Sequence, residues 1–228
     1  MKKCMKKLTA VLLTLAIALT SVLFAAPNIT EAKAASGDIC INPYYHNMVL
    51  TYKPGDIYTG YYTNIYINGC SKKSQIKSLK STNKSVKLEA KDGYITAHFP
   101  KKAFKTTITC TVKGKKLKTT LTIKKYTNPL KVLKIDNTNF TKKLDRDDSY
   151  SQKKKFSNKK MSIQLKSGWK ISSVYVYNNS SSSSWRNLNT AKFSKKISLT
   201  SSYAYVNIYV YNTKTGVSEC LSLYRSNY

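Results

Sequence analysis

The sequence predicts an all-β protein: two tandem β-sandwich domains that follow an N-terminal signal peptide. Apolar and polar residues alternate with a period of two through most of the chain, as they do in strands with one buried face. Gly, Pro, Asn and Ser separate these runs at short intervals, and no stretch beyond residue 34 has helical periodicity. Many short strands without helices are typical of sandwiches.

The first 34 residues have the pattern of a secretory signal peptide. Four lysines fall within the first seven positions, an apolar run extends over Leu8–Ala26, and Ala32-Lys33-Ala34 offers a cleavage site. The run is nearly long enough to span a bilayer, so an uncleaved anchor is the alternative. No second such run and no Leu-Pro-x-Thr-Gly sorting signal follow. We therefore expect a secreted, extracellular protein, which its charge can retain on the cell surface.

Residues 35–126 form the first predicted domain. Its expected strands are Thr59–Ile67, Ile76–Leu79, Val86–Ala90, Tyr94–Phe99, Thr106–Val112 and Leu117–Ile123. Asp92-Gly93 and Lys113-Gly114 suit tight hairpins, because Gly supplies the positive φ that such turns need. Lys53-Pro54-Gly55-Asp56 also suits a turn, in which Pro sets φ.

Residues 127–129 are the expected linker, because Pro129 cannot continue a central strand. Residues 130–228 form the second predicted domain. Its expected strands are Leu130–Ile135, Met161–Lys166, Lys170–Tyr177, Ala191–Leu199, Tyr203–Tyr211 and Val217–Tyr224. Two polar segments, Asp145–Asn158 and Asn178–Ser184, are expected to be loops.

Lysine dominates the charge. The chain has 40 Lys and Arg against 10 Asp and Glu; without the five lysines and one glutamate of the first 34 residues, 35 basic and 9 acidic residues give a net charge of +26. Lysine is a hydrated point charge that attracts anions diffusely, whereas arginine is better at bidentate recognition. The charge thus predicts affinity for anionic polymers such as teichoic acid, anionic glycans or nucleic acid, without sequence-specific recognition of nucleic acid. The alternative is a solvated lysine-rich surface without a dedicated ligand.

Four cysteines follow the signal peptide, and none belongs to a Cys-x-x-Cys motif. Outside the cell they can form disulfides. Cys70 with Cys110 is the favoured candidate disulfide, since it links the end of one strand to the inner face of another. Cys40 with either of them, and a cross-domain bond to Cys220, are the alternatives.

The segment TTITC at Thr106–Cys110 resembles the Thr-Leu-x-Thr-Cys strand end of sortase transpeptidases, in which the Cys is the nucleophile. Thr107 replaces the Leu, and no arginine lies between Cys110 and Arg146 to stabilise an oxyanion. Alternation also places Cys110 on the inner face with Ile108. We therefore expect a buried, unreactive thiol.

No other pattern predicts a catalytic centre, a cofactor or a metal site. The Gly-x-Ser-x-Gly, His-Glu-x-x-His, Walker and dinucleotide-binding motifs are absent, and the two histidines, His46 and His98, are isolated. Asp145, Asp147 and Asp148 form the one acidic cluster, for which a solvated loop is expected and calcium binding is the alternative. We expect no enzymatic activity; an enzyme of unrecognised type is the alternative.

Three motifs of the first domain occur in a known family. They are a Ser-x-Asn-x-x-Val step at Ser81–Val86, a Gly-x-Ile-Thr-Ala step at Gly93–Ala97 and a Thr-rich strand at Thr106–Thr109. Residues from about 38 to 126 thereby resemble the bacterial Ig-like group 2 domain of secreted and surface proteins, although Lys102–Lys105 replaces its usual Gly. The resemblance implies an Ig-like sandwich that acts as a spacer, adhesion or carbohydrate-associated module, without catalytic residues. An Ig-like second domain follows from its strand pattern alone.

Tyrosines occupy one face of the predicted strand Tyr203–Tyr211, and small apolar residues occupy the other. Tyr175 and Tyr177 alternate with valines in the same way. In an Ig-like order these two strands pair in one sheet. The candidate binding residues are Tyr175, Tyr177, Tyr203, Tyr205, Tyr209 and Tyr211, with lysines expected nearby. Such a face can stack on sugar rings or bases; alternatively, it only stabilises the sheet, or packs on the first domain or a partner.

These observations together predict a non-enzymatic surface protein for adhesion, or for binding cell-wall glycans or other anionic polymers. A purely structural envelope spacer held by charge is the alternative.

Overall fold

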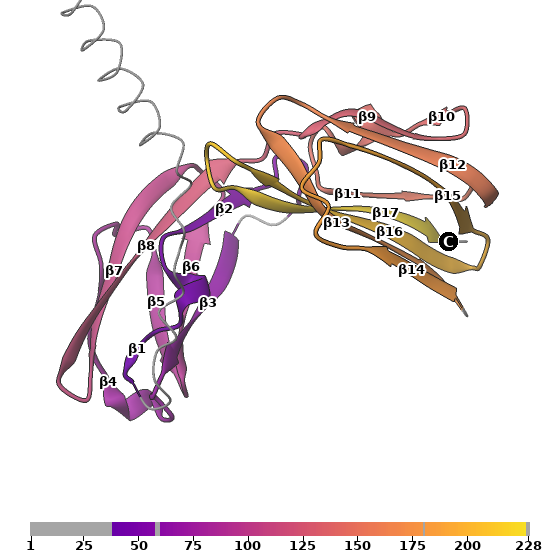
Figure 1. The fold of residues 1–228 in the computed structure, drawn as a ribbon. Helices are drawn as coiled ribbons and strands as arrows, with labels where there is room; N and C mark the ends of the chain where they lie inside the picture. The colour runs from indigo at the N-terminus through magenta and orange to yellow at the C-terminus, as the bar shows by residue number, and fades with distance from the viewer. Residues whose placement is uncertain (1–37, 58–59, 180, 227–228) are drawn as a thin grey trace, which may run out of the picture. The chain divides into compact units, whose positions relative to one another are not determined.

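The computed structural model describes residues 38–57, 60–179 and 181–226, and the regular elements in them are β-strands apart from three short 3-10 turns (Figure 1). The chain is therefore all-β, as the alternation predicts. The expected signal peptide, residues 1–34, lies outside the described residues. No helix in the described ranges is long and apolar enough to cross a membrane.

The first sandwich consists of two four-stranded sheets, with the strand orders β1-β3-β6-β5 and β2-β8-β7-β4. The strands are β1 (Cys40–Ile41), β2 (Met48–Tyr52), β3 (Gly60–Asn68), β4 (Ile76–Ser81), β5 (Lys87–Lys91), β6 (Tyr94–Pro100), β7 (Phe104–Val112) and β8 (Lys115–Lys125). The Ig fold places strands A, B, E and D in one sheet and C, F and G in the other. Strands β1, β3, β6 and β5 match the first set, and β4, β7 and β8 match the second, so this sandwich is Ig-like.

Strand β7, which contains the TTITC segment, has its expected orientation. Ile108, Cys110 and Val112 are buried in the core, whereas Thr107, Thr109 and Thr111 lie on the outer face. The β7–β8 hairpin turns through Lys113 and Gly114, whose φ angles of 47° and 80° are both positive. This two-residue turn has the geometry that the Lys-Gly step predicts.

The second sandwich has a four-stranded sheet with the order β10-β9-β12-β15 and a five-stranded sheet with the order β11-β17-β16-β13-β14. The strands are β9 (Leu130–Ile135), β10 (Thr138–Asn139), β11 (Ser149–Gln152), β12 (Phe156–Leu165), β13 (Trp169–Asn178), β14 (Ser181–Trp185), β15 (Lys192–Leu199), β16 (Tyr203–Asn212) and β17 (Ser218–Ser226). The sequence β13-β16-β17 matches the C-F-G order of the Ig fold.

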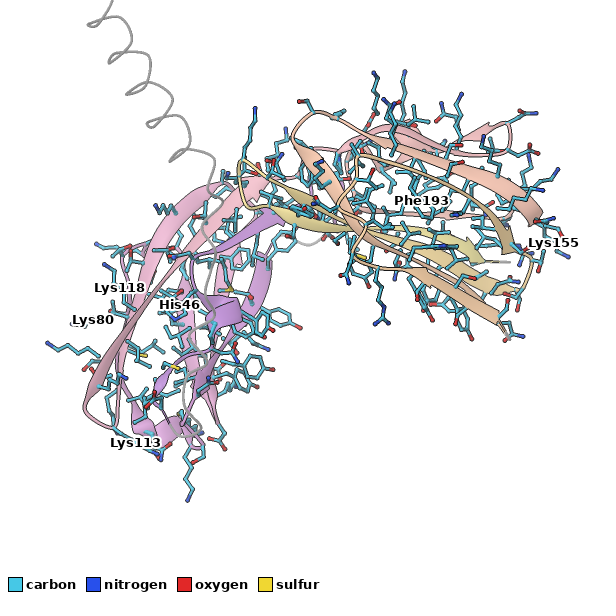
Figure 2. All side chains as sticks on the ribbon, viewed as in Figure 1. His46, Lys80, Lys113, Lys118, Lys155 and Phe193 are labelled. Atoms are coloured by element: carbon cyan, nitrogen blue, oxygen red, sulfur yellow. The ribbon has the colours of Figure 1, made fainter. Side chains whose placement is uncertain are left out.

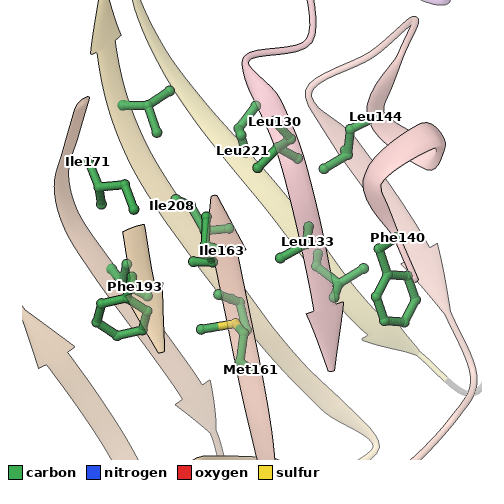
Figure 3. Close-up of a cluster of buried hydrophobic side chains, with 14 of the residues drawn as sticks. Leu130, Leu133, Phe140, Leu144, Met161, Ile163, Ile171, Phe193, Ile208 and Leu221 are labelled. Atoms are coloured by element: carbon green, nitrogen blue, oxygen red, sulfur yellow. The ribbon is translucent and has the colours of Figure 1, made fainter. Parts of the chain in front are cut away.

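Inward-facing residues of both sheets fill the core of the second sandwich (Figure 3). Leu133 on β9 and Met161 on β12 come from one sheet, and Ile208 on β16 and Leu221 on β17 come from the other; all four are fully buried. The buried apolar side chains of the described chain fall into two clusters, one of residues 41–123 and one of residues 126–223. The exact boundary at residues 127–129 stays a prediction.

Two segments that were expected to be loops contain strands. Ser181–Trp185 pairs with β13 as an edge strand, and Ser149–Gln152 pairs with β17 in parallel. Both segments lack the apolar alternation that identifies a strand in sequence. They are strands because their backbone groups hydrogen-bond to a neighbour whose own pattern is strong.

Candidate functional site

The outer surface of the five-stranded sheet carries the predicted tyrosines. Strands β13 and β16 are antiparallel neighbours, and Tyr177 lies directly opposite Tyr205. Valine, alanine and isoleucine at the alternate positions are buried, so alternation turns the tyrosines outward. Tyr203 and Tyr209 are the most exposed, at 57% and 42%. We call this surface the tyrosine face; its members are Tyr175, Tyr177, Tyr203, Tyr205, Tyr209, Tyr211 and Tyr224.

Tyr205 is the centre of a contiguous group of rings. Its ring stacks on that of Tyr177 with 5.2 Å between centroids and 19° between planes. The rings of Tyr175, Tyr203 and Tyr224 lie 5.9, 5.8 and 6.0 Å from it. Burial raises the pKa of Tyr205, so its hydroxyl stays protonated and can donate a hydrogen bond.

Tyr224 is the member that the sequence analysis missed. It lies on β17 directly opposite Tyr205, and it is half-buried. The alternation that marks an outward-facing residue was present in the sequence, since Leu221 and Leu223 are buried and alternate with Tyr224. However, Ser222 is buried as well, which weakens the contrast between the two faces of this strand.

Tyr209 and Tyr211 lie farther along β16, away from the group of rings around Tyr205. Tyr209 is opposite Cys220 on β17, and the charge of a Cys220 thiolate is the main cause that raises the pKa of Tyr209. The hydroxyl of Tyr211 donates to Asn189 Oδ1 at 2.8 Å. The Tyr209 phenol is therefore a neutral polar group, and it lies with Tyr211 at the end of the tyrosine face.

The surroundings of the rings are polar but mostly uncharged. Ser182 and Ser184 on β14 lie opposite Tyr177 and Tyr175. On β17, the Ser222 hydroxyl donates to Asn207 Oδ1 at 2.9 Å. The lysines expected beside the tyrosines are largely elsewhere. Among the paired residues of β13 and β16 there is one lysine, Lys170, which lies opposite Tyr211. Strand pairing explains this, because the lysine-rich strands β9, β12 and β15 form the other sheet.

That other sheet of the second sandwich has a cationic outer face. Lys160 on β12 lies directly opposite Lys196 on β15, and Ser162 lies between Lys134 and Ser194. Like charges directly opposite each other destabilise a sheet unless something neutralises them. A shallow cavity of about 350 Å³ lies between Lys160 and Lys192, with the hydroxyls of Ser162 and Ser194 at its lining. This arrangement suits an anion.

A second cationic face lies on the sheet of the first sandwich that contains β7. Thr109 lies between Lys80 on β4 and Lys118 on β8, and Thr111 lies between Lys77 and Lys116 in the same way. Thr109 of the TTITC segment and Thr111, just after it, thus lie in a lysine-flanked groove, a cavity of about 460 Å³. In Figure 2 the labelled Lys80 and Lys118 project from this side of the first sandwich. We call these two cationic surfaces the lysine faces.

The structure does not support Cys110 as a nucleophile. Cys110 is 3% exposed, and burial raises the pKa of its thiol to about 11. A buried thiol in apolar surroundings is unreactive, because the thiolate is the nucleophile. The Nε2 of His46, one of the two histidines upstream of Cys110, hydrogen-bonds the carbonyl oxygen of Ile41 at 3.0 Å.

The described cysteines are free thiols. The charge of Cys70 contributes to the raised pKa of Cys110, so the two sulfurs interact electrostatically. Their pairing as a disulfide stays a prediction. In the same described ranges, no group of three or more His, Cys, Asp or Glu side chains is placed to hold a metal ion. In the acidic cluster, Asp145 Oδ1 accepts a hydrogen bond from Asn128 at 2.8 Å.

No family model matches this chain, and no curated protein matches it in sequence. The resemblance of residues 38–126 to the bacterial Ig-like group 2 domain therefore rests on its motifs, and the Ig-like assignment rests on the strand order described above.

Several solved structures are similar to this chain, with low sequence identity and low TM-scores. The fibronectin(III)-like modules of Clostridium thermocellum CbhA are 12% identical with a TM-score of 0.32, over 83% of this chain and 93% of that one. The titin fragment I67–I69 is 10% identical with a TM-score of 0.27, over 83% and 64%. A Bacteroides ovatus GH5 xyloglucanase in complex with a heptasaccharide is 16% identical with a TM-score of 0.30, over 44% of this chain and 22% of the enzyme.

Proposed function

We propose that this chain is a non-enzymatic, secreted or surface-associated Ig-like protein that binds glycans of a cell wall or cell surface through the tyrosine face. The supporting observation is the contiguous group of rings around Tyr205, bordered by serine and asparagine. Aromatic rings pack against the apolar faces of sugars, while phenol, hydroxyl and amide groups exchange hydrogen bonds with sugar hydroxyls. The near absence of charge on the paired β13 and β16 positions favours a neutral glycan at this site.

The lysine faces have a separate role in this proposal. They attract anionic polymers such as teichoic acid or acidic glycans and retain the protein on an anionic surface. The clustered lysines create a positive potential that raises the local concentration of polyanions, and added salt screens it.

A structural envelope spacer held by charge is the second candidate function, and one observation favours it. Cross-strand tyrosine pairs stabilise a half-exposed sheet without any ligand. Under that alternative the lysine faces alone retain the protein. An enzyme of unrecognised type is the third candidate, and it requires an exposed cleft with converging catalytic groups.

Binding to a purified cell-wall preparation and to an array of neutral glycans separates these candidates. The double variant Tyr205→Ala/Tyr209→Ala should lose retention on the neutral glycan, whereas Tyr44→Ala, at a tyrosine 81% exposed in the first sandwich, should bind as the parent does. A single cooperative thermal unfolding transition, above the temperature of the binding assay, checks that each variant keeps the fold. Retention that the tyrosine variant keeps, and that disappears for both proteins at high salt, would instead establish the charge-held spacer.

A further inference from the structure

The first sandwich also carries an aromatic surface, which no single stretch of sequence reveals. It is the outer face of β3, β6 and β5, where residues lie opposite one another in three transverse rows. The outermost row consists of Tyr62, His98 and Lys87, and the row at the other end consists of Tyr66, Tyr94 and Lys91. In both rows the aromatic residue is on β3 and the lysine is on β5.

Three tyrosine rings adjoin one another at tilted angles at one end of this surface. The ring centroids of Tyr66 and Tyr94 are 5.1 Å apart, and the ring of Tyr45, from the turn before β2, lies 5.3 Å from Tyr66 on the other side. Tyr66 is 43% exposed. These rings already contact one another, so they present their outward surfaces to solvent and leave no slot between them.

Polar groups occupy the middle row. The hydroxyl of Thr96 donates to Asn64 Oδ1 at 3.0 Å, across β3 and β6. Glu89, the third member of the row, forms an ion pair with Lys91, and that hydrogen bond lowers the pKa of its carboxyl. Its other oxygen lies 4.0 Å from His98 Nε2. The one carboxylate of these three rows is thus paired within the surface.

A cavity of about 530 Å³ adjoins the outermost row. Its lining includes Tyr62, Ser85, Lys87, His98 and Lys102, and none of the described residues that line it has a carboxylate side chain. Tyr62 is 68% exposed, and its ring lies 6.1 Å from that of His98. A cavity of this size, with an exposed ring and two lysines, falls within the range of small-ligand sites.

We propose that this surface is a second binding site and that its ligand is an acidic oligosaccharide. One sugar ring packs on Tyr62, and its carboxylate lies between the ammonium groups of Lys87 and Lys102. The chain then continues over Asn64 and Thr96 toward the tyrosines at the other end. The outer rows are four residues apart along β3, or ~14 Å, which is longer than a single sugar ring and therefore selects an oligosaccharide.

Single-stranded nucleic acid is the competing ligand, because it too combines stacking with positive charge. One feature disfavours it: the centroids of the neighbouring Tyr66 and Tyr94 rings are 5.1 Å apart, which leaves no gap for a base to enter between them.

This inference is independent of the proposed function, since it uses another sheet and other residues. Variants of Tyr205 and Tyr209 should leave it unchanged, and variants of Tyr62, Lys87 and Lys102 should leave binding at the tyrosine face unchanged. The failure of one proposal is thus distinguishable from the failure of the other.

The test is calorimetric titration of the purified protein with oligogalacturonate, with a neutral oligosaccharide of the same length and with a single-stranded oligonucleotide, at constant salt. We expect binding to oligogalacturonate alone. Lys87→Gln/Lys102→Gln and Tyr62→Ala should each weaken it at least tenfold. Lys153→Gln/Lys155→Gln, the same charge change at two exposed lysines of the second sandwich that lie outside the lysine faces, should change it less than twofold.

Each remaining outcome would overturn the proposal. Equal losses in the two lysine variants would mean that net charge alone attracts the ligand. Tighter binding of the oligonucleotide would assign the surface to nucleic acid. No binding of oligogalacturonate by the folded parent protein would remove the site.

Discussion

Replacing Tyr177 and Tyr205 by alanine, singly and together, measures how far the tyrosine face stabilises its own sheet. The two residues are directly opposite on β13 and β16, with 5.2 Å between ring centroids. Stacked aromatic pairs contribute about 0.5–1.5 kcal/mol beyond area burial. We therefore expect a coupling free energy of about 1 kcal/mol between the two substitutions.

The single substitution Tyr205→Ala should cost more than this coupling. Its ring contacts the rings of four other tyrosines, including Tyr177. Three of these four rings lie on neighbouring strands, and at about 0.2–1 kcal/mol for each cross-strand contact the loss in the free energy of unfolding is about 0.6–3 kcal/mol. Tyr177→Ala removes two cross-strand ring contacts and should cost about two thirds as much.

Urea unfolding followed by tryptophan fluorescence is the assay. Both tryptophans of the chain, Trp169 and Trp185, belong to the second sandwich, so the signal reports on the domain that carries the substitutions. Tyr177 with Tyr211 is the control cycle, since Tyr211 is six residues from Tyr205 along β16, or ~20 Å. The control should be additive within about 0.5 kcal/mol. A Tyr177–Tyr205 coupling no larger than the control would refute the stacked arrangement.

Three further predictions concern the thiols and the lysine faces. If Cys70 and Cys110 form a disulfide, closing that 41-residue loop should stabilise the oxidised protein by up to about 4 kcal/mol. Peptide mapping without reductant should then recover the two peptides linked together. Recovery of both cysteines as alkylated free thiols would contradict the pairing. In the reduced protein, burial raises the pKa of Cys110 from 9.0 to about 11, so the stability that its neutral thiol contributes is complete below pH 9 and is lost as pH rises through 11. Parallel pH profiles for the parent and Cys110→Ala, measured by urea unfolding, would exclude this. Lys80→Gln/Lys118→Gln should reduce the salt dependence of binding to a phosphate-bearing polymer. The slope of the logarithm of the binding constant against the logarithm of the salt concentration should be smaller in magnitude by about one for each lysine that contacts phosphate. An unchanged slope would show that this lysine face does not bind the polymer.

The fold was largely predictable because alternation is strong where one face of a strand is buried. Strands β9 and β16 follow the expected ranges closely: in β9 the leucines and Ile135 are buried while Val132 is half-buried, and in β16 the small apolar residues lie in the core between outward tyrosines. Strands β11 and β14 were not predicted, because one is a short parallel partner and the other is a polar edge. Their pairing depends on backbone hydrogen bonds, which leave no apolar pattern in the sequence.

The candidate sites were predictable only where their residues share a strand. The tyrosines of β16 are consecutive outward positions, so the sequence alone indicates an aromatic face. The aromatic surface of the first sandwich takes Tyr45, Tyr66 and Tyr94 from three separate segments, and strand register brings them together. The lysine faces were missed for the same reason, because Lys80 and Lys118 come together only across the β4-β7-β8 sheet.

The second sandwich presents its tyrosines and its lysines on opposite sheets, whose layers are ~10 Å apart. Two polymers can therefore occupy one domain at once without competing for space. A molecule that binds both polymers as proposed would be a cross-linker: at low concentration it would join a neutral glycan to an anionic chain, and in excess it would coat each polymer separately. Turbidity of a mixture of the two polymers should consequently rise and then fall as protein is added. Bridging requires that one domain binds both polymers at the same time, and excess protein makes this rare. The same division makes retention cooperative, since a protein already held by one sheet meets the second polymer at a raised effective concentration.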